Sequence, residues 1–344
     1  MILRGRGEVE ARADEWKRIA WSSEQGELPY FLAEPGEPLA LLEPPAALVG
    51  KVDARRLESR IGYVRAYAPR LRILRVNAVA GDAAVLARTA LQEVDVVAVP
   101  ALPVDSPEYR ALAPLASGRH GSWTRRRLVL PDSFDAFLTG LSRKSRSGVR
   151  YDAKRLEDAL AAHVEVAREP ADEPIAAIDS IARTTYQRRL GAGFSLERAE
   201  VLRVALAHGW ARVFLLYDGE TPVAFWWCAV HGDTMRLNTT GYLEQYAAHR
   251  PGIYLLMRVI ENAIADPALR TLDFGPGRSA YKQHFSNDGY EERNLLLFAP
   301  TFRAQRARTL RSGLDVVAAG ARRALDATGG TQRVKTAWRR RLRS

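Results

Sequence analysis

The feature that most constrains the fold is a single segment, residues 211–242, with the sequence ARVFLLYDGETPVAFWWCAVHGDTMRLNTTGY. Its three runs of β-branched and aromatic residues are separated by DG and GD, which are signals for tight turns. The segment therefore predicts a three-stranded antiparallel meander. Helical periodicity precedes it at residues 172–190 and 195–209, with Ser195 as a candidate cap and Gly209 as a candidate stop.

The chain after the meander alternates between helix and strand. We expect a helix at PGIYLLMRVIENAIAD, a strand at RTLDFG, a helix that Ser279 caps, and a last strand at ERNLLLFAP. The order in this half is thus two helices, three strands, helix, strand, helix, strand. It predicts a mixed α/β domain over residues 131–300.

The first 130 residues show the same kind of alternation less clearly. PYFLAE and LALLEP are typical of two strands, residues 54–68 have the spacing of a helix, and RLRILRVNAV and VDVVAVPA are typical of strands. RRRLVLP predicts a further strand, after which Ser133 can cap a helix, a basic helix follows, and HVEVARE is strand-like. We expect an N-terminal α/β half at residues 1–130 and a basic, partly helical or disordered tail at residues 301–344.

The charge of the chain is concentrated in that tail. The whole sequence has a net charge of +11, and the tail holds 12 basic residues against Asp315 and Asp326, so the body is nearly neutral. The basic pI therefore does not indicate a nucleic-acid-binding body. A single cysteine excludes an internal disulfide, no apolar run is long enough to span a bilayer, and no export signal is visible, so we expect a cytoplasmic protein.

Three short motifs carry a resemblance to a known superfamily. DGETPVAFWW in the first hairpin, HRPGIYLL before the following helix and LDFGPGRSAYKQHF after it resemble the GNAT-type N-acyltransferases, in the branch of the FemAB-like and CelD-type (cellulose biosynthesis) acetyltransferases. The resemblance covers about residues 130–300. It implies a mixed, mostly antiparallel sheet with flanking helices, in two GNAT-like halves, and an acyltransferase that uses acetyl-CoA or another acyl-CoA and no metal.

The resemblance also implies where the acyl donor binds. The fourth and fifth strands of these folds splay apart, and pantetheine bonds to the open edge of the fourth strand, here at Asn238, Thr239 and Thr240. The diphosphate then lies at the N-terminus of the next helix, which implies the residues Arg250, Pro251, Gly252, Ile253 and Tyr254. This chain has one glycine there instead of a longer glycine-rich loop, and PG before an apolar helix is also simply a helix start.

The implied catalytic residues are Tyr281, Lys282 and Asp273. Tyr281 corresponds to the tyrosine that protonates the leaving thiolate, and Lys282 is a candidate for orienting an anionic group. Asp273 can act as a base, or it can brace the glycine turn that follows it. The acceptor is an amine or hydroxyl on a small molecule, a glycan or a peptide, and it attacks the thioester directly.

Other features have more than one interpretation. The basic run at residues 142–155 is a solvated helix face or a lip for anionic groups, and Cys228, Trp226 and Trp227 are expected in the core. The tail has an apolar side around Leu310, Leu314, Val317 and Ala318. We rank three interpretations of it: first a disordered tail that aids solubility, second an anchor on anionic membranes, and third a contact for nucleic acid. Two other function classes are a FemAB-like transferase that uses aminoacyl-tRNA and a non-catalytic GNAT-like binding module.

Overall fold

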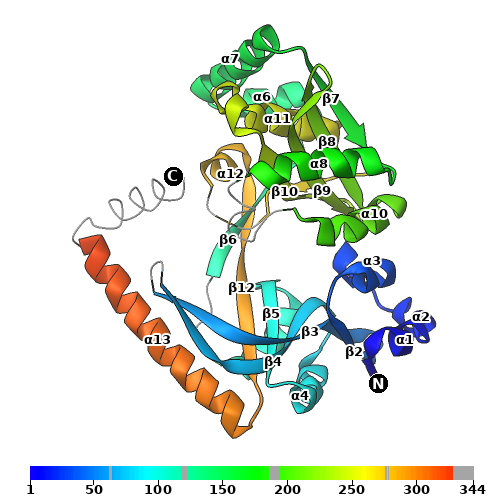
Figure 1. Cartoon of the computed structure of the whole chain (residues 1–344), viewed down its shortest axis with the longest axis vertical. Coiled ribbons are helices and arrows are strands. Elements are labelled where there is room, and N and C mark those ends of the chain that lie inside the picture. Colours follow the sequence, from blue (N-terminus) through cyan, green and yellow to red (C-terminus); the bar gives the residue numbers. More distant parts are fainter. Residues whose placement is uncertain (62–63, 118–121, 186–193, 276, 278, 328–344) are drawn as a thin grey trace. The chain divides into compact units, whose positions relative to one another are not determined.

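The protein divides into two compact units. The computed structural model describes residues 1–61, 64–117, 122–185, 194–275, 277 and 279–327 (Figure 1). The first unit comprises Met1–Ile19, Gly36–Gly121 and Asn294–Ser344, and the second comprises Ala20–Pro35 and Ser122–Arg293.

The first unit is a mostly antiparallel sheet with helices. Its strands are arranged in the order β1-β2-β3-β4-β5-β12, and β4 and β5 are parallel to each other. In chain order its elements are β1 (Ile2–Arg4), α1 (Gly5–Glu10), α2 (Ala13–Trp16), β2 (Glu37–Glu43), β3 (Ala46–Ile61), β4 (Val64–Ala80), α4 (Ala84–Glu93), β5 (Val96–Pro103), α5 (Pro107–Leu112), η2 (Ala113–Leu115), the later part of β12 (Asp288–Phe298) and α13 (Phe302–Ala327).

The second unit repeats this plan of a mostly antiparallel sheet with helices. Its strands are arranged in the order β7-β8-β9-β10-β11-β6-β12, and β10 and β11 form its parallel pair. In chain order its elements are η1 (Glu24–Gly26), α3 (Leu28–Ala33), β6 (Ser122–Val129), α6 (Phe134–Gly140), α7 (Arg143–Ala159), β7 (Ala162–Ala167), α8 (Asp172–Thr184), η3 (Leu196–Arg198), α10 (Ala199–Ala207), β8 (Ala211–Asp218), β9 (Thr221–His231), β10 (Thr234–Tyr242), η4 (Glu244–His249), α11 (Pro251–Ala265), β11 (Thr271–Asp273), α12 (Ala280–Phe285) and the first part of β12.

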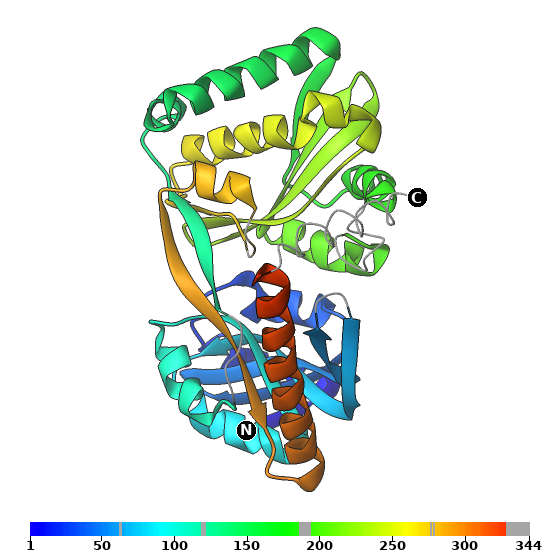
Figure 2. The ribbon, with the colours of Figure 1, turned by 90° about the vertical axis from the view of Figure 1, so that its left-hand side faces the viewer.

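The sheet of the second unit is covered on both faces. α7 and α11 pack on one face and α8 and α10 on the other (Figure 2). Trp226 and Trp227 follow each other on β9, so their side chains enter opposite layers, and both are buried as expected. The meander is also as predicted: Gly219 and Gly232 adopt positive φ angles in its two turns, a conformation that glycine adopts without strain.

Each unit contains a strand that the chain order would assign to the other. β6 follows the helices of the first unit but pairs with β11, and β12 pairs with β6 through residues 288–293 before its later part joins β5. The limits of the units therefore fall at residues 121 and 293, where we expected 130 and 300, and residues 20–35 belong to the second unit. The expected fold class, a mixed and mostly antiparallel sheet with flanking helices, is confirmed.

Two predicted elements are wrong. Residues 54–68 were expected as a helix, but their described parts, 54–61 and 64–68, belong to the paired strands β3 and β4, in which Glu58 is opposite Tyr67 and Ile61 is opposite Val64. Pairing over such a long hairpin overrides the local helical spacing. PYFLAE, expected as a strand, lies in α3, where Pro29 is near the start of the helix and Tyr30 and Phe31 are buried.

The tail begins as part of the first unit. Ala304 and Ala307 of α13 are fully buried against Leu71, Ile73 and Phe298. The start of α13 is therefore core, and a free tail can begin only later in the chain.

Candidate active site

The parallel strands β10 and β11 form a fork. They pair over three residues only, from Thr234 opposite Thr271 to Arg236 opposite Asp273, and β11 then ends. β10 continues to Tyr242 and stays paired with β9 at its other edge, with a register shift between Leu237 and Thr239. Residues 237–242 thus extend past β11 and leave the β11-facing edge of β10 without a strand partner in the described part of the chain.

The three polar residues predicted for donor binding lie on this free part of β10. Thr239 is buried on the face of Trp227, because these two residues are opposite each other across β9 and β10. Thr240 lies opposite Trp226, on the other face, and its hydroxyl donates to the carbonyl of Phe225 at 2.8 Å. Asn238 occupies the irregularity between Leu237 and Thr239 and is half-buried.

The N-terminus of α11 is less open to an anion than the sequence suggested. Arg250 adopts a left-handed backbone conformation, and its guanidinium forms an ion pair of 2.6 Å with the buried Asp152 of α7. The amides of Ile253 and Tyr254 donate to the carbonyl of Arg250, at 3.0 and 3.2 Å, and Pro251 has no amide hydrogen. Gly252 therefore carries the one first-turn amide with no backbone acceptor among the described residues.

Gly252 is nevertheless linked to one catalytic candidate, Tyr281, through Trp226. A Cβ atom there would meet only Tyr242, at an ordinary 3.7 Å, so packing does not explain the glycine. Its carbonyl accepts a hydrogen bond of 3.4 Å from the indole of Trp226, whose ring centroid is 6.5 Å from that of Tyr281. Trp226 thus connects the start of α11 with Tyr281. Tyr254 is directed elsewhere: its hydroxyl donates to Glu157 of α7 at 3.0 Å.

Tyr281 and Lys282 differ sharply in their surroundings. Tyr281 lies edge-on to Trp226 and Phe274, and burial raises the pKa of its phenol to about 12, so it stays protonated at neutral pH. Lys282 is buried and donates to the carbonyl of Gly275 at 3.1 Å. Burial, with a further contribution from the charge of Arg125, lowers the pKa of Lys282 to about 8.

Asp273 is the centre of a buried charge network. Nε of Arg125 lies 2.8 and 2.9 Å from its two carboxylate oxygens, and the Gly275 amide donates to it at 2.8 Å. Gly275 has a φ of +72°, and a Cβ there would lie 2.8 Å from the carbonyl of Leu237 on β10. Asp273 therefore stabilises the turn at Gly275, and only glycine can make this turn so close to β10. This agrees with the interpretation that Asp273 braces the turn. The role of Asp273 as a base stays a prediction.

Sequence reasoning missed the partners of Asp273. Arg125 comes from β6, and it also contacts Glu292 of β12 at 3.4 Å, which in turn accepts from the Trp123 indole at 2.8 Å. Burial raises the pKa of Glu292, and Arg125 opposes that shift. The sequence contains no local signal for them, because β6 contains three consecutive arginines and the start of β12 contains several charged residues. Nothing local shows which of these residues is buried, or that β6 lies between β11 and β12.

Other candidates stay outside this site. Cys228 is fully buried among apolar side chains, and burial raises the pKa of its thiol. No group of three or more His, Cys, Asp or Glu side chains that could hold a metal occurs in the described residues. Across that same part of the chain, no helix is both long and apolar enough to cross a membrane.

This fork-and-helix geometry is the architecture of a GNAT-type domain, and comparison with known families supports it. Residues 143–283 match the family model described as an acetyltransferase (GNAT) domain. Residues 143–283, which lie within the second unit, therefore form a GNAT-type domain, as the resemblance implied. A comparison with curated proteins finds no match for this sequence.

Solved structures extend the similarity of the fold over most of the chain. The structure of FemX has a TM-score of 0.52 at 11% identity and covers 84% of this chain and 96% of its own. The C-terminal domain of a putative lysylphosphatidylglycerol synthetase from Agrobacterium fabrum has a TM-score of 0.55 at 9% identity, with coverage of 90% and 96%. L-PGS from Bacillus licheniformis has a TM-score of 0.54 at 12% identity, with coverage of 90% and 97%. At these identities the likeness is one of fold.

Proposed function

We propose that the protein transfers an acyl group, acetyl or longer, from acyl-CoA to an amine or hydroxyl acceptor at the fork of the second unit. The observation that carries the proposal is the free edge of β10 over residues 237–242, on the face where Trp226 connects Gly252 with Tyr281. An extended pantetheine amide chain can pair with such an edge as an added strand does. The thioester at its end would then lie near the start of α12.

The chemistry needs few groups. The acceptor nitrogen or oxygen bonds to the thioester carbonyl carbon, and the carbon–sulfur bond breaks as the tetrahedral intermediate collapses. Tyr281, which keeps its proton because burial raises its pKa, donates that proton to the departing sulfur, and the proton lost by the acceptor restores the phenol. Lys282 holds the Gly275 turn through its carbonyl, and Asp273 holds the same turn through its amide.

A second donor, aminoacyl-tRNA, is favoured by one specific observation. A diphosphate would find only the Gly252 amide at the start of α11, because Ile253 and Tyr254 already donate to Arg250, whose side chain is engaged by Asp152. The fold similarity to FemX over most of the chain is compatible with this FemAB-like alternative. Acceptors in either case include small molecules, glycans, peptides and, from the similarity to a putative lysylphosphatidylglycerol synthetase, lipid headgroups.

A substitution at Gly252 tests the donor. Gly252→Ala has room for its methyl group, so we expect unchanged or slightly higher thermal stability, while the methyl group obstructs close approach of a diphosphate to the backbone. The parent should be stabilised by acetyl-CoA, longer acyl-CoAs or free CoA in a thermal-shift assay, and Gly252→Ala should lose most of that shift. Gly140→Ala, at the open end of α6, is the matched control.

The outcomes separate the alternatives. If no CoA compound shifts the melting temperature of the parent and the protein transfers an acyl group from a charged tRNA, the donor is aminoacyl-tRNA and not acyl-CoA. A parental CoA shift in Gly252→Ala would move the diphosphate away from α11. If the protein transfers an acyl group from neither donor, the remaining alternative is a non-catalytic GNAT-like binding module.

A further inference from the structure

One face of α13 carries large apolar side chains that nothing in the described structure covers. The opposite face packs on the first unit through Ala304 and Ala307. On the outer face Phe302 is 84% exposed, Leu310 46%, Val316 72% and Val317 57%. These four residues, which we name the α13 stripe, share one side of the helix because their spacing follows the helical repeat. Leu314, expected on the apolar side, is instead half-buried.

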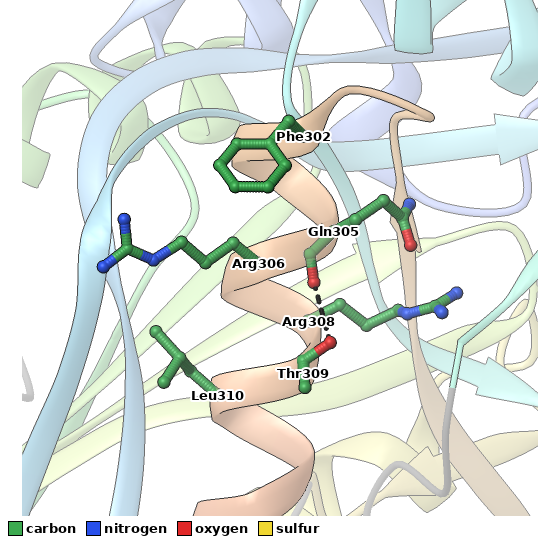
Figure 3. A pocket seen from close by; sticks show the side chains of 6 residues that line it. All are labelled: Phe302, Gln305, Arg306, Arg308, Thr309 and Leu310. Atoms are coloured by element: carbon green, nitrogen blue, oxygen red, sulfur yellow. Dashed lines mark hydrogen bonds between the residues drawn. The ribbon is translucent and has the colours of Figure 1, made fainter.

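Arginines accompany the stripe. Figure 3 shows Arg306 and Arg308 extending to opposite sides of the helix, with Phe302 and Leu310 a turn above and a turn below Arg306. These residues, with Gln305 and Thr309, line a shallow depression of about 380 Å³. Neither arginine has an acidic partner within ion-pair distance in the described chain, whereas Arg311 lies 3.6 Å from Asp315. Exposed apolar groups therefore lie among uncompensated positive charges.

We propose that the α13 stripe docks the protein on an anionic lipid bilayer. A helix lying in the interface places its apolar side chains at the acyl boundary, and flanking arginines extend to the lipid phosphates. Phe302, Val316 and Val317 supply the apolar contact, and Arg306 and Arg308 supply the attraction to negative headgroups. The buried alanines hold the helix against the first unit, so the stripe is presented without rearrangement of the core.

The charges argue against two other occupants. In a dimer packed stripe to stripe about a two-fold axis, Arg306 and Arg308 would lie close to the same arginines of the second copy. These like charges would repel each other. RNA would pair with the arginines but would leave Val316 and Val317 without a function, since its affinity comes mainly from phosphate contacts. An anionic bilayer uses both kinds of side chain.

Vesicle co-sedimentation of the full chain tests the proposal. We expect binding to vesicles of phosphatidylcholine with phosphatidylglycerol and little binding to phosphatidylcholine alone. Phe302→Ser with Val317→Ser should lower the affinity by at least roughly tenfold, because two exposed apolar anchors are lost. Arg306→Glu with Arg308→Glu should do the same and reduce the dependence on salt. Val85→Ser on α4, where Val85 is 61% exposed, is the matched control and should bind like the parent.

Other outcomes overturn the proposal. The Phe302→Ser, Val317→Ser variant could bind vesicles like the parent, while removal of residues 328–344 abolishes binding. That result would assign the bilayer contact to residues 328–344. Equal binding to neutral vesicles would remove the role of the arginines. A dimer that this variant abolishes in sedimentation equilibrium, without vesicle binding by the parent, would assign the stripe to a second copy. Thermal unfolding by circular dichroism confirms that each variant is folded.

Discussion

Each of the two units contains a short parallel strand pair that forms a fork, and the residues around the two forks differ. In the first unit β4 and β5 pair in parallel over three residues, from Ile73 opposite Val96 to Arg75 opposite Ala98, with α4 between them and α5 after them. The second unit repeats this order with β10, α11, β11 and α12.

The difference lies in what occupies each fork. At the start of α4 the carboxylate of Asp82 accepts the Ala84 amide at 3.1 Å, so the place of an anion is taken by the chain itself. Val76 and Val79 of β4 and Val99 and Leu102 of β5, which lie beyond the paired residues, are buried in one apolar cluster. The second fork has Arg250 and Gly252 at the corresponding helix start. The splayed pair is thus a structural motif that both units share, whereas the side chains around it differ between them.

The largest expected effect separates the two tyrosines that follow the forks. Tyr281→Phe keeps the ring packing, so we expect turnover to fall by roughly 10²–10⁴-fold with little change in the acyl-donor KM. Tyr109→Phe, on α5 of the first unit, should stay within a few-fold of the parent. Steady-state kinetics at saturating substrates measure both. Parental turnover in Tyr281→Phe would remove the proposed mechanism.

A smaller effect distinguishes a buried brace from an exposed ion pair. Asp273→Asn leaves Arg125 buried without its main partner, and we expect a loss of about 3–5 kcal/mol in unfolding free energy. Asp53→Asn, which breaks the exposed Asp53–Arg75 pair at the first fork, should cost less than about 1 kcal/mol. Denaturant unfolding gives both values. A large loss of turnover at parental stability would instead make Asp273 a catalytic base.

The residues after the two tyrosines predict a pH effect for one fork only. Arg110 is exposed and donates to the carbonyl of Asp105, whereas the buried Lys282 donates to Gly275 and has a pKa of about 8. The ordinary pKa of a lysine is 10.5, so between pH 8 and pH 10.5 Lys282 is protonated in the unfolded chain but not in the native protein. Stability from this group should therefore rise with pH across that window. Lys282→Met should remove the rise in unfolding free energy, and an unchanged pH profile would contradict the assignment.

The smallest effect concerns the helix start in the first unit. Asp82→Ala removes the acceptor for the Ala84 amide, so we expect a loss of about 1 kcal/mol. Donor binding, measured by calorimetry, should be unchanged because buried apolar side chains surround this fork. A gain of CoA affinity at a second site in this variant would show that Asp82 alone had closed the first fork.

Local sequence signals predicted much of the second unit. The meander, α11, β11 and α12 depend on turn residues and helical spacing, which act over a few positions, and Ser133 caps α6 as expected, through the Ala136 amide. The long β3–β4 hairpin and the Arg125–Asp273 pair could not be predicted in this way. Arg125 and Asp273 are 148 residues apart, and the carboxylate finds its partner only because β6 lies beside β11. The residues flanking the fork were predicted, whereas the network that braces it was not.

The exchanged strands determine the order in which the protein can fold during synthesis. When the ribosome has produced the first 121 residues, the first unit still lacks the later part of β12 and the whole of α13. In the second unit, β6 pairs with β11 at one edge, and its other edge has no partner until residues 288–293 of β12 have been made. Both sheets thus become complete only after β12, residues 288–298, has been made. A truncated chain ending before β12 would expose an unpaired strand edge in each unit, which makes such products candidates for aggregation and rapid proteolysis.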